Sequence, residues 1–144
     1  MLLLVAGLVL FFGMHAVPML PGLRGRLQGT LSARGYALAF TLVSALGLVL
    51  IVLGYGELQG RPRLNPDLWS PPRWTRHVTM LLMLPAMILL VAAYVPSRIR
   101  TAAKHPMLAA VKLWALGHLI ANGDLASIIL FGSFLVWAVA DRIS

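Results

Sequence analysis

The sequence predicts an all-α, polytopic membrane protein that forms a bundle of about five transmembrane helices. Of the 144 residues, 60% are hydrophobic and only 11% are charged, whereas soluble domains are about one-quarter charged. The apolar residues gather in runs long enough to cross a bilayer. The longest polar stretch, residues 57–74, is too short to form a core of its own. We therefore expect one integral-membrane domain over residues 1–144.

The five expected spans follow one another with short joints. A helix needs about 20 residues to cross the hydrocarbon layer, and the apolar runs place the spans at 2–20, 36–55, 74–94, 106–122 and 125–140. A basic loop joins the first two spans, and a loop rich in proline, arginine and tryptophan, which we expect to lie ordered at the interface, joins the next two. The Asn122-Gly123 pair predicts a tight turn with left-handed backbone conformations, so the last two spans should form an antiparallel hairpin. Because the last span is short and the chain ends directly after it, we expect the native chain to continue past Ser144.

Charge and cysteine content exclude several classes of protein. The formal net charge is +8, but the basic residues are scattered through short loops. This pattern is typical of topology selection and of contact with anionic headgroups, not of nucleic-acid binding. The absence of cysteine excludes disulfides, iron–sulfur clusters and thiolate-ligated haem. More lysine and arginine on the first and third loops and the C-terminus than on the opposite face favours an N-terminus outside the cytoplasm.

Four histidines lie in or beside the expected spans: His15, His77, His105 and His118. Ionisable groups in a membrane are costly and usually functional, and histidine is a common ligand of haem iron and other metals. Alternation of the spans places His15 and His105 toward one face and His77 and His118 toward the other. His105 and His118 are about 20 Å apart along one helix, whereas two imidazoles on one metal lie about 4 Å apart. Two candidate pairs therefore remain, beside the alternative that these histidines only pack or meet headgroups.

A lysine shares the helix face of one of these histidines. Lys112 follows His105 by seven residues, which places the two within about 20° of each other around a helix. A lysine inside a span must line a cavity, pair with an anion or extend to the interface. Lys112 therefore either meets an acidic group of a cofactor, such as a propionate, on the side of His105, or extends toward the headgroups.

Three segments resemble a known family: LVLFFGMHAVPMLPGLRGRL, WSPPRWTRHVTMLLMLPAMILLVAAYVPSRIR and KHPMLAAVKLWALGHLIANGDLASIILFGSFLVWAVADRIS. They closely resemble the NnrU family of bacterial inner-membrane proteins, and the likeness covers nearly the whole chain. The last segment is the most specific, with its His-Pro-Met, Lys-Leu-Trp, Gly-His-Leu and Asn-Gly-Asp elements in order. The resemblance implies a multi-pass protein of the bacterial inner membrane, which would put the N-terminus in the periplasm. It also implies a link to denitrification and nitric oxide metabolism.

The NnrU family is related to the plant 15-cis-zeta-carotene isomerase, an integral membrane enzyme whose haem b is held by histidines. That resemblance implies haem b in this chain, with His15 and His105 at the positions of the axial ligands. His77 and His118 match further histidines of the family. The implied activities are redox-gated cis–trans isomerisation of a polyene or carotenoid-like lipid, or binding of nitric oxide.

Two alternatives from other classes stay open. One is a transmembrane electron-transfer protein in which both histidine pairs hold a haem. The other is a non-catalytic membrane carrier or assembly factor, in which the histidines relay protons or simply pack.

Overall fold

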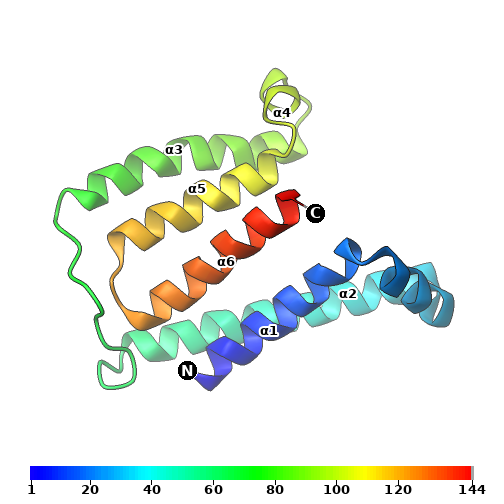
Figure 1. Ribbon diagram of the computed structural model, residues 1–144, viewed down its shortest axis with the longest axis horizontal. Coiled ribbons are helices and arrows are strands. Elements are labelled where there is room, and N and C mark those ends of the chain that lie inside the picture. Colours follow the sequence, from blue (N-terminus) through cyan, green and yellow to red (C-terminus); the bar gives the residue numbers. More distant parts are fainter. Residues whose placement is uncertain (144) are drawn as a thin grey trace. The chain divides into compact units, whose positions relative to one another are not determined.

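The structure is a computed structural model that describes residues 1–143, and this part of the chain is mostly helical, with one long loop between residues 60 and 74 (Figure 1). This part contains six α-helices, one short 3-10 helix and an isolated β-bridge between Asp67 and Asp124, and it has no β-strand. The predicted all-α class is therefore confirmed. The helices form two compact units, Met1–Leu64 and Asn65–Ser144, and each is described by itself.

The first unit is a helical hairpin. Its elements are α1 (Leu2–Ala16), the 3-10 helix η1 (Val17–Met19) and α2 (Pro21–Gln59). Glycines bring the two long helices into backbone contact. A β-carbon on Gly7 would lie 2.6 Å from the backbone nitrogen of Ile51, and one on Gly47 would lie 2.8 Å from that of Phe11. At Gly54 a β-carbon would collide with the backbone of α1. Small residues of this kind let membrane helices pack closely where the hydrophobic effect gives no drive for association.

The prediction of a basic loop between the first two spans is wrong. Residues 21–31 are helical and form the first part of α2. Ser32, with φ 65° and ψ 164°, separates this arm from the longer part that packs on α1. Four leucines recur along the arm every three or four residues: Leu20, Leu23, Leu27 and Leu31. Arg24 and Arg26 are exposed. An amphipathic basic helix of this type is suited to a bilayer interface, and the spacing of its leucines was the signal for it.

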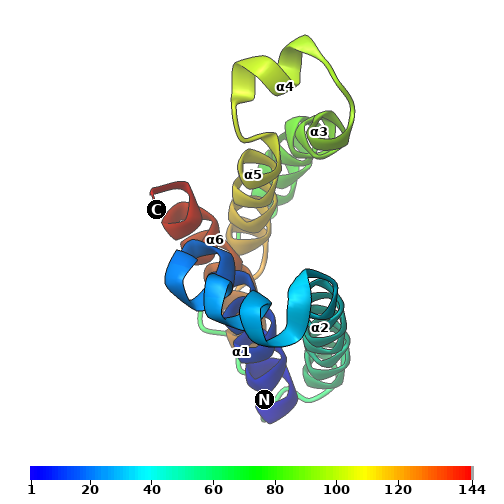
Figure 2. The ribbon, with the colours of Figure 1, turned by 90° about the vertical axis from the view of Figure 1, so that its right-hand side faces the viewer.

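The second unit contains three long helices and one short one: α3 (Thr75–Tyr94), α4 (Arg98–Ala103), α5 (Pro106–Ala121) and α6 (Leu125–Ile143). Helix α5 packs between α3 and α6 and runs antiparallel to both (Figure 1), so the predicted hairpin of the last two spans is confirmed. The hydroxyl of Thr79 links α3 to α5, because it donates to the carbonyl of Gly117 at 2.7 Å. Helix α4 stands beyond the ends of α3 and α5 (Figure 2).

The polar loop before α3 is fastened to the turn between α5 and α6. The side-chain nitrogen of Asn65 donates to Asp124 at 2.9 Å, and its oxygen accepts from the backbone N–H of Ala126 at 2.7 Å. Asp124 also accepts from the backbone N–H and the hydroxyl of Ser127, at 3.0 and 2.6 Å, which caps the start of α6. We call these four residues the loop clasp. It confirms that this part of the loop is ordered, and it places the start of α3 and the end of α5 at the same end of the unit.

Glycine is needed at position 123 because two backbones approach closely there, and not because the turn is left-handed. Among residues 1–143 no glycine has a positive φ, and Asn122 is extended with φ −124° and ψ 130°, so the predicted left-handed turn is wrong. The backbone of Gly123 instead lies against the carbonyl of Trp69, where a β-carbon would collide. The Gly123 carbonyl accepts from the backbone N–H of Leu68 at 2.8 Å. Close approach of two backbones therefore selects glycine here.

Within residues 1–143, four helices are long and apolar enough to cross a membrane: α1 with η1, α2, α3 and α6. Helix α5 is shorter, at 16 residues, and spans about 24 Å at 1.5 Å per residue against a hydrocarbon layer of about 30 Å. The outer face of α3 is apolar and exposed, as at Leu81 and Leu84. The predicted bundle is confirmed as four long helices and one shorter apolar helix.

Candidate functional site

His15 lies on the face of α1 that packs against α2, with its ring between two phenylalanines. It stacks on Phe11 with 4.1 Å between ring centroids, and the Phe40 ring of α2 lies 5.1 Å away. Its Nδ1 is 2.7 Å from the carbonyl oxygen of Phe11. Because a carbonyl only accepts, Nδ1 carries the hydrogen, and in the neutral ring the lone pair is on Nε2. Metal-bound histidines are oriented by this type of hydrogen bond.

A buried hydroxyl lies one helical turn from Phe40. Tyr36 is 7% exposed, and its ring centroid is 6.3 Å from that of Phe40. Its hydroxyl has no hydrogen-bond partner within the described residues. A buried polar group without a partner costs about 1–3 kcal/mol, so Tyr36 is a candidate for contact with a ligand. No sequence motif distinguishes Tyr36 from an ordinary interfacial tyrosine, so it was not predicted as a site residue.

His105 precedes the first residue of α5, and its side chain is exposed. The turn that places it is strained: Lys104 has φ 58° and ψ −49°, and the backbone N–H of His105 donates to the carbonyl of Ala103 at 2.6 Å. This is a γ-turn of the positive-φ form, which is rare. His105 borders an open pocket of about 380 Å³ with Ala93, Arg100, Lys104, Pro106, Met107, Leu108, Trp137 and Asp141. From the sequence, Arg100 and Lys104 were predicted only to influence membrane topology, as basic residues of the third loop.

Lys112 is half-buried on α5. Ala110 and Gly117 are buried on the α3 side of this helix, and Lys112 is about 160° around the helix from Ala110, so it points away from α3. Arg61 pairs with Glu57, whereas among residues 1–143 Lys112 has no carboxylate partner. Both predicted roles, contact with a cofactor acid and extension to the interface, remain predictions.

His118 lies in an aromatic cluster between α5 and α6. Its ring stacks on Phe131 at 4.5 Å with only 8° between the planes, and Trp114 approaches edge-on at 5.5 Å. Trp114 also contacts Phe131 at 5.0 Å and Phe134 at 5.4 Å. The imidazole therefore packs here as a flat aromatic ring.

His77 is exposed in the first turn of α3. Thr75 and Thr79 are buried on the α5 side of this helix, and His77 lies roughly 160–200° from both at 100° per residue. It points away from α5, whereas His118 packs toward α6, so the structure does not bring this predicted pair together. His15 belongs to the first unit and His105 to the second, and their pairing stays a prediction.

The side chains of residues 1–143 determine which metal centre this part of the chain could coordinate. Among residues 1–143 the structure shows no group of three or more His, Cys, Asp or Glu side chains that could hold a metal ion, the arrangement that a zinc site of protein ligands needs. Haem needs fewer protein ligands, because the protein supplies only the axial ones. The fixed tautomer of His15 fits this demand.

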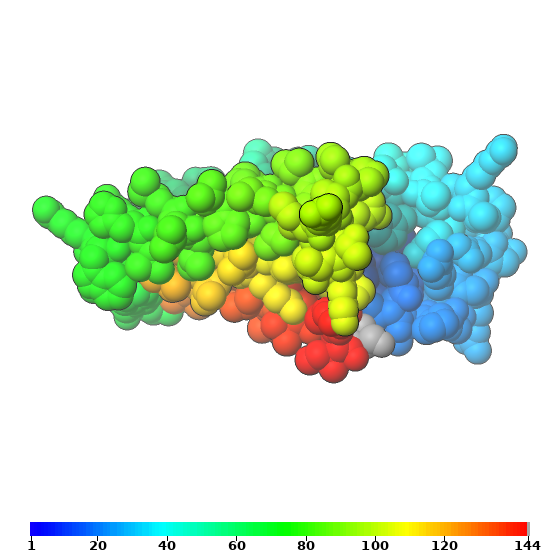
Figure 3. Space-filling view, turned by 90° about the horizontal axis from the view of Figure 1, so that it is seen from above, coloured from blue at the N-terminus to red at the C-terminus, as the bar shows by residue number. Residues whose placement is uncertain are grey.

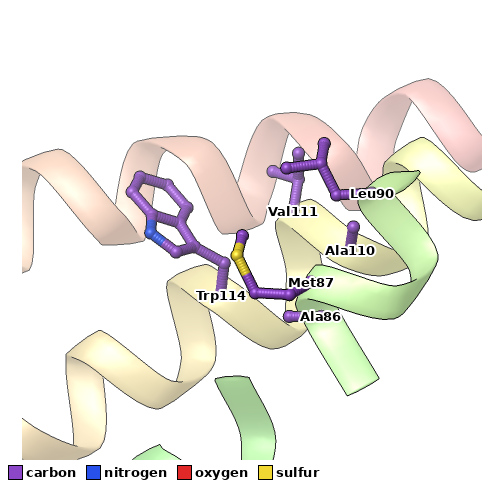
Figure 4. A pocket seen from close by; sticks show the side chains of 6 residues that line it. All are labelled: Ala86, Met87, Leu90, Ala110, Val111 and Trp114. Atoms are coloured by element: carbon purple, nitrogen blue, oxygen red, sulfur yellow. The ribbon is translucent and has the colours of Figure 1, made fainter. Parts of the chain in front are cut away.

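An apolar crevice lies between α3 and α5 (Figure 4). Its volume is about 180 Å³, and it is lined by Ala86, Met87, Leu90, Ala110, Val111 and Trp114. Figure 4 shows Met87 extending toward Trp114. Ligand pockets usually measure about 300–1,000 Å³, so this crevice is too small to enclose a long polyene.

The apolar helices, which form a glycine-packed hairpin and a second unit of three long helices and a short one, define the class: a multi-pass, all-α membrane protein. A family model described as NnrU protein matches residues 3–144. The chain therefore belongs to the NnrU family, as its sequence motifs predicted. The comparisons with curated proteins and with solved structures found no match.

Proposed function

We propose that the chain is a haem-b-binding protein of the bacterial inner membrane, with its N-terminus in the periplasm and with His15 and His105 as axial ligands. The observation that supports this most directly is the hydrogen bond from Nδ1 of His15 to the Phe11 carbonyl. It fixes the tautomer, directs the lone pair to Nε2 and raises the basicity of the ring as a ligand.

The side chains around the two histidines supply what a haem site needs from the protein. Phe11 and Phe40 pack against the His15 ring, and apolar neighbours of this kind would tune the potential of a bound iron. Lys112 lies about 10 Å along α5 from His105, and its long side chain would bring a positive charge toward a propionate. Bound haem would supply reversible one-electron chemistry.

The two imidazoles are held with different firmness. His15 is stacked and hydrogen-bonded on the packed face of α1, whereas His105 is exposed at a strained turn. His105 would therefore be the less firmly held of the two ligands. Both proposed activities, redox-gated isomerisation of a polyene lipid and binding of nitric oxide, would require one exchangeable ligand of this kind.

The test is the absorption spectrum of the purified chain in detergent, reduced and oxidised, after haem supplementation. We expect a Soret band that His15→Ala and His105→Ala each weaken, while His77→Ala, which removes an exposed imidazole on the outer face of α3, leaves it unchanged. A colourless wild type would contradict the proposal. Two haems per chain in a pyridine haemochrome assay would instead favour the electron-transfer alternative.

A further inference from the structure

Two hollows flank the short helix α4. The first, which we call the apolar groove, follows the C-terminal half of α3 and has a volume of about 400 Å³. It is lined by Met87, Ile88, Val91, Ala92, Val95, Ser97 and Ile99. Several of these side chains are exposed on the outer face of the helix, among them Val91 and Val95. In a membrane-spanning chain such a groove meets lipid chains.

The second hollow, which we call the basic pocket, is the one that His105 borders. It carries the full charges of Arg100 and Lys104 against one carboxylate, that of Asp141. Neither Arg100 nor Lys104 forms an ion pair with another of residues 1–143. The pocket therefore presents an excess of positive charge at the end of the helices, where headgroups lie.

Neighbouring residues of helix α4 line the two hollows. Ile99 lines the apolar groove, and its neighbour Arg100 lines the basic pocket, because successive residues of a helix point about 100° apart. Figure 3 shows α4, in yellow-green, against the end of α3. Lys104, which borders the basic pocket, holds the strained backbone of the γ-turn. Strain of this kind persists where the surroundings or a function require it.

We propose that the α4 elbow binds one anionic phospholipid. An acyl chain lies in the apolar groove, and the phosphate is held by Arg100 and Lys104. A phospholipid satisfies both hollows at once. Its acyl chain suits an apolar groove beside an exposed transmembrane helix. Its phosphate suits a guanidinium, which can bind two phosphate oxygens together. The excess positive charge selects a lipid with net negative charge over a zwitterionic one.

Native mass spectrometry of the full chain in detergent, titrated with phosphatidylglycerol or phosphatidylcholine, tests this proposal. We expect preferential retention of phosphatidylglycerol, weakened about fivefold by Arg100→Ala, as the loss of one basic residue at a membrane surface implies. Arg98→Ala is the matched control, because this exposed arginine on the same helix does not line the pocket. Val95→Trp should fill the apolar groove and lower retention, whereas Leu84→Trp, exposed on α3 outside the groove, should not.

Lys104→Gly separates lipid binding from backbone strain. Glycine accepts a positive φ without a penalty, so this variant should unfold at a higher temperature and yet retain less phosphatidylglycerol. Equal retention by the Arg98→Ala and Arg100→Ala variants would overturn the proposal, as would displacement of the lipid by millimolar inorganic phosphate, which would mark a free-phosphate site. A Soret shift in Arg100→Ala with unchanged lipid retention would also overturn it and assign the pocket to haem propionates.

Discussion

Replacing Asn65 by alanine should destabilise the second unit by about 2–4 kcal/mol. The change removes one hydrogen bond to Asp124, worth about 1 kcal/mol net. It also leaves the backbone N–H of Ala126 without its acceptor. Ala126 is fully buried, and a buried donor without a partner costs about 1–3 kcal/mol more.

The measurement is equilibrium unfolding of the detergent-solubilised chain, followed by circular dichroism and tryptophan fluorescence. Trp69 and Trp74 lie in and beside the loop and report its release. The control is Asp67→Ala in the same loop, whose exposed side chain forms no hydrogen bond within the described residues, with an expected change within about 0.5 kcal/mol. If Asn65→Ala and Asp67→Ala unfold alike, the loop clasp does not stabilise the unit and the reasoning is refuted.

Three further substitutions test other contacts. Gly54→Ala should cost about 1–3 kcal/mol in the same unfolding assay, because its β-carbon meets the backbone of α1, whereas Gly56→Ala, which points into open space, should be neutral or stabilising. Tyr36→Phe removes a buried hydroxyl without a partner, so the melting temperature should hold or rise; a loss of more than about 1 kcal/mol would show that the hydroxyl is bonded. His118→Phe keeps the stack on Phe131, so the Soret band of haem-loaded protein should keep its intensity; a fall by half would point to a second haem.

Much of the fold was predictable because the membrane constrains it. Long apolar runs must become helices, and the short joint at 122–124 left an antiparallel hairpin as the arrangement of the last two spans. The features that were missed depend on contacts distant in sequence. Nothing local shows that Gly123 lies against Trp69, or that Gly7 and Gly47 let α1 and α2 touch. The helical arm at 21–31 was obscured by its arginines and glycines.

The candidate site was predictable only in its residue types. Ionisable side chains in apolar segments are costly, so the four histidines could be selected from the sequence, and the resemblance to the NnrU family then favoured His15 and His105. The hydrogen bond that sets the tautomer of His15 and the strained turn before His105 are matters of geometry. The stacking of His118 on Phe131 is likewise set by how α5 and α6 pack.

The loop clasp also sets an order of events during synthesis. Asn65 leaves the ribosome first, and its partner Ala126 follows 61 residues later, roughly 3–12 s at ordinary elongation rates. During that interval α3 must be inserted while the partners of Asn65 have not yet been made. The polar groups of the loop before α3 therefore remain in water. The glycine-packed hairpin of α1 and α2 needs no such delay, because both of its helices have already been made. The amino-terminal half can therefore assemble in the membrane before the carboxy-terminal half has been translated.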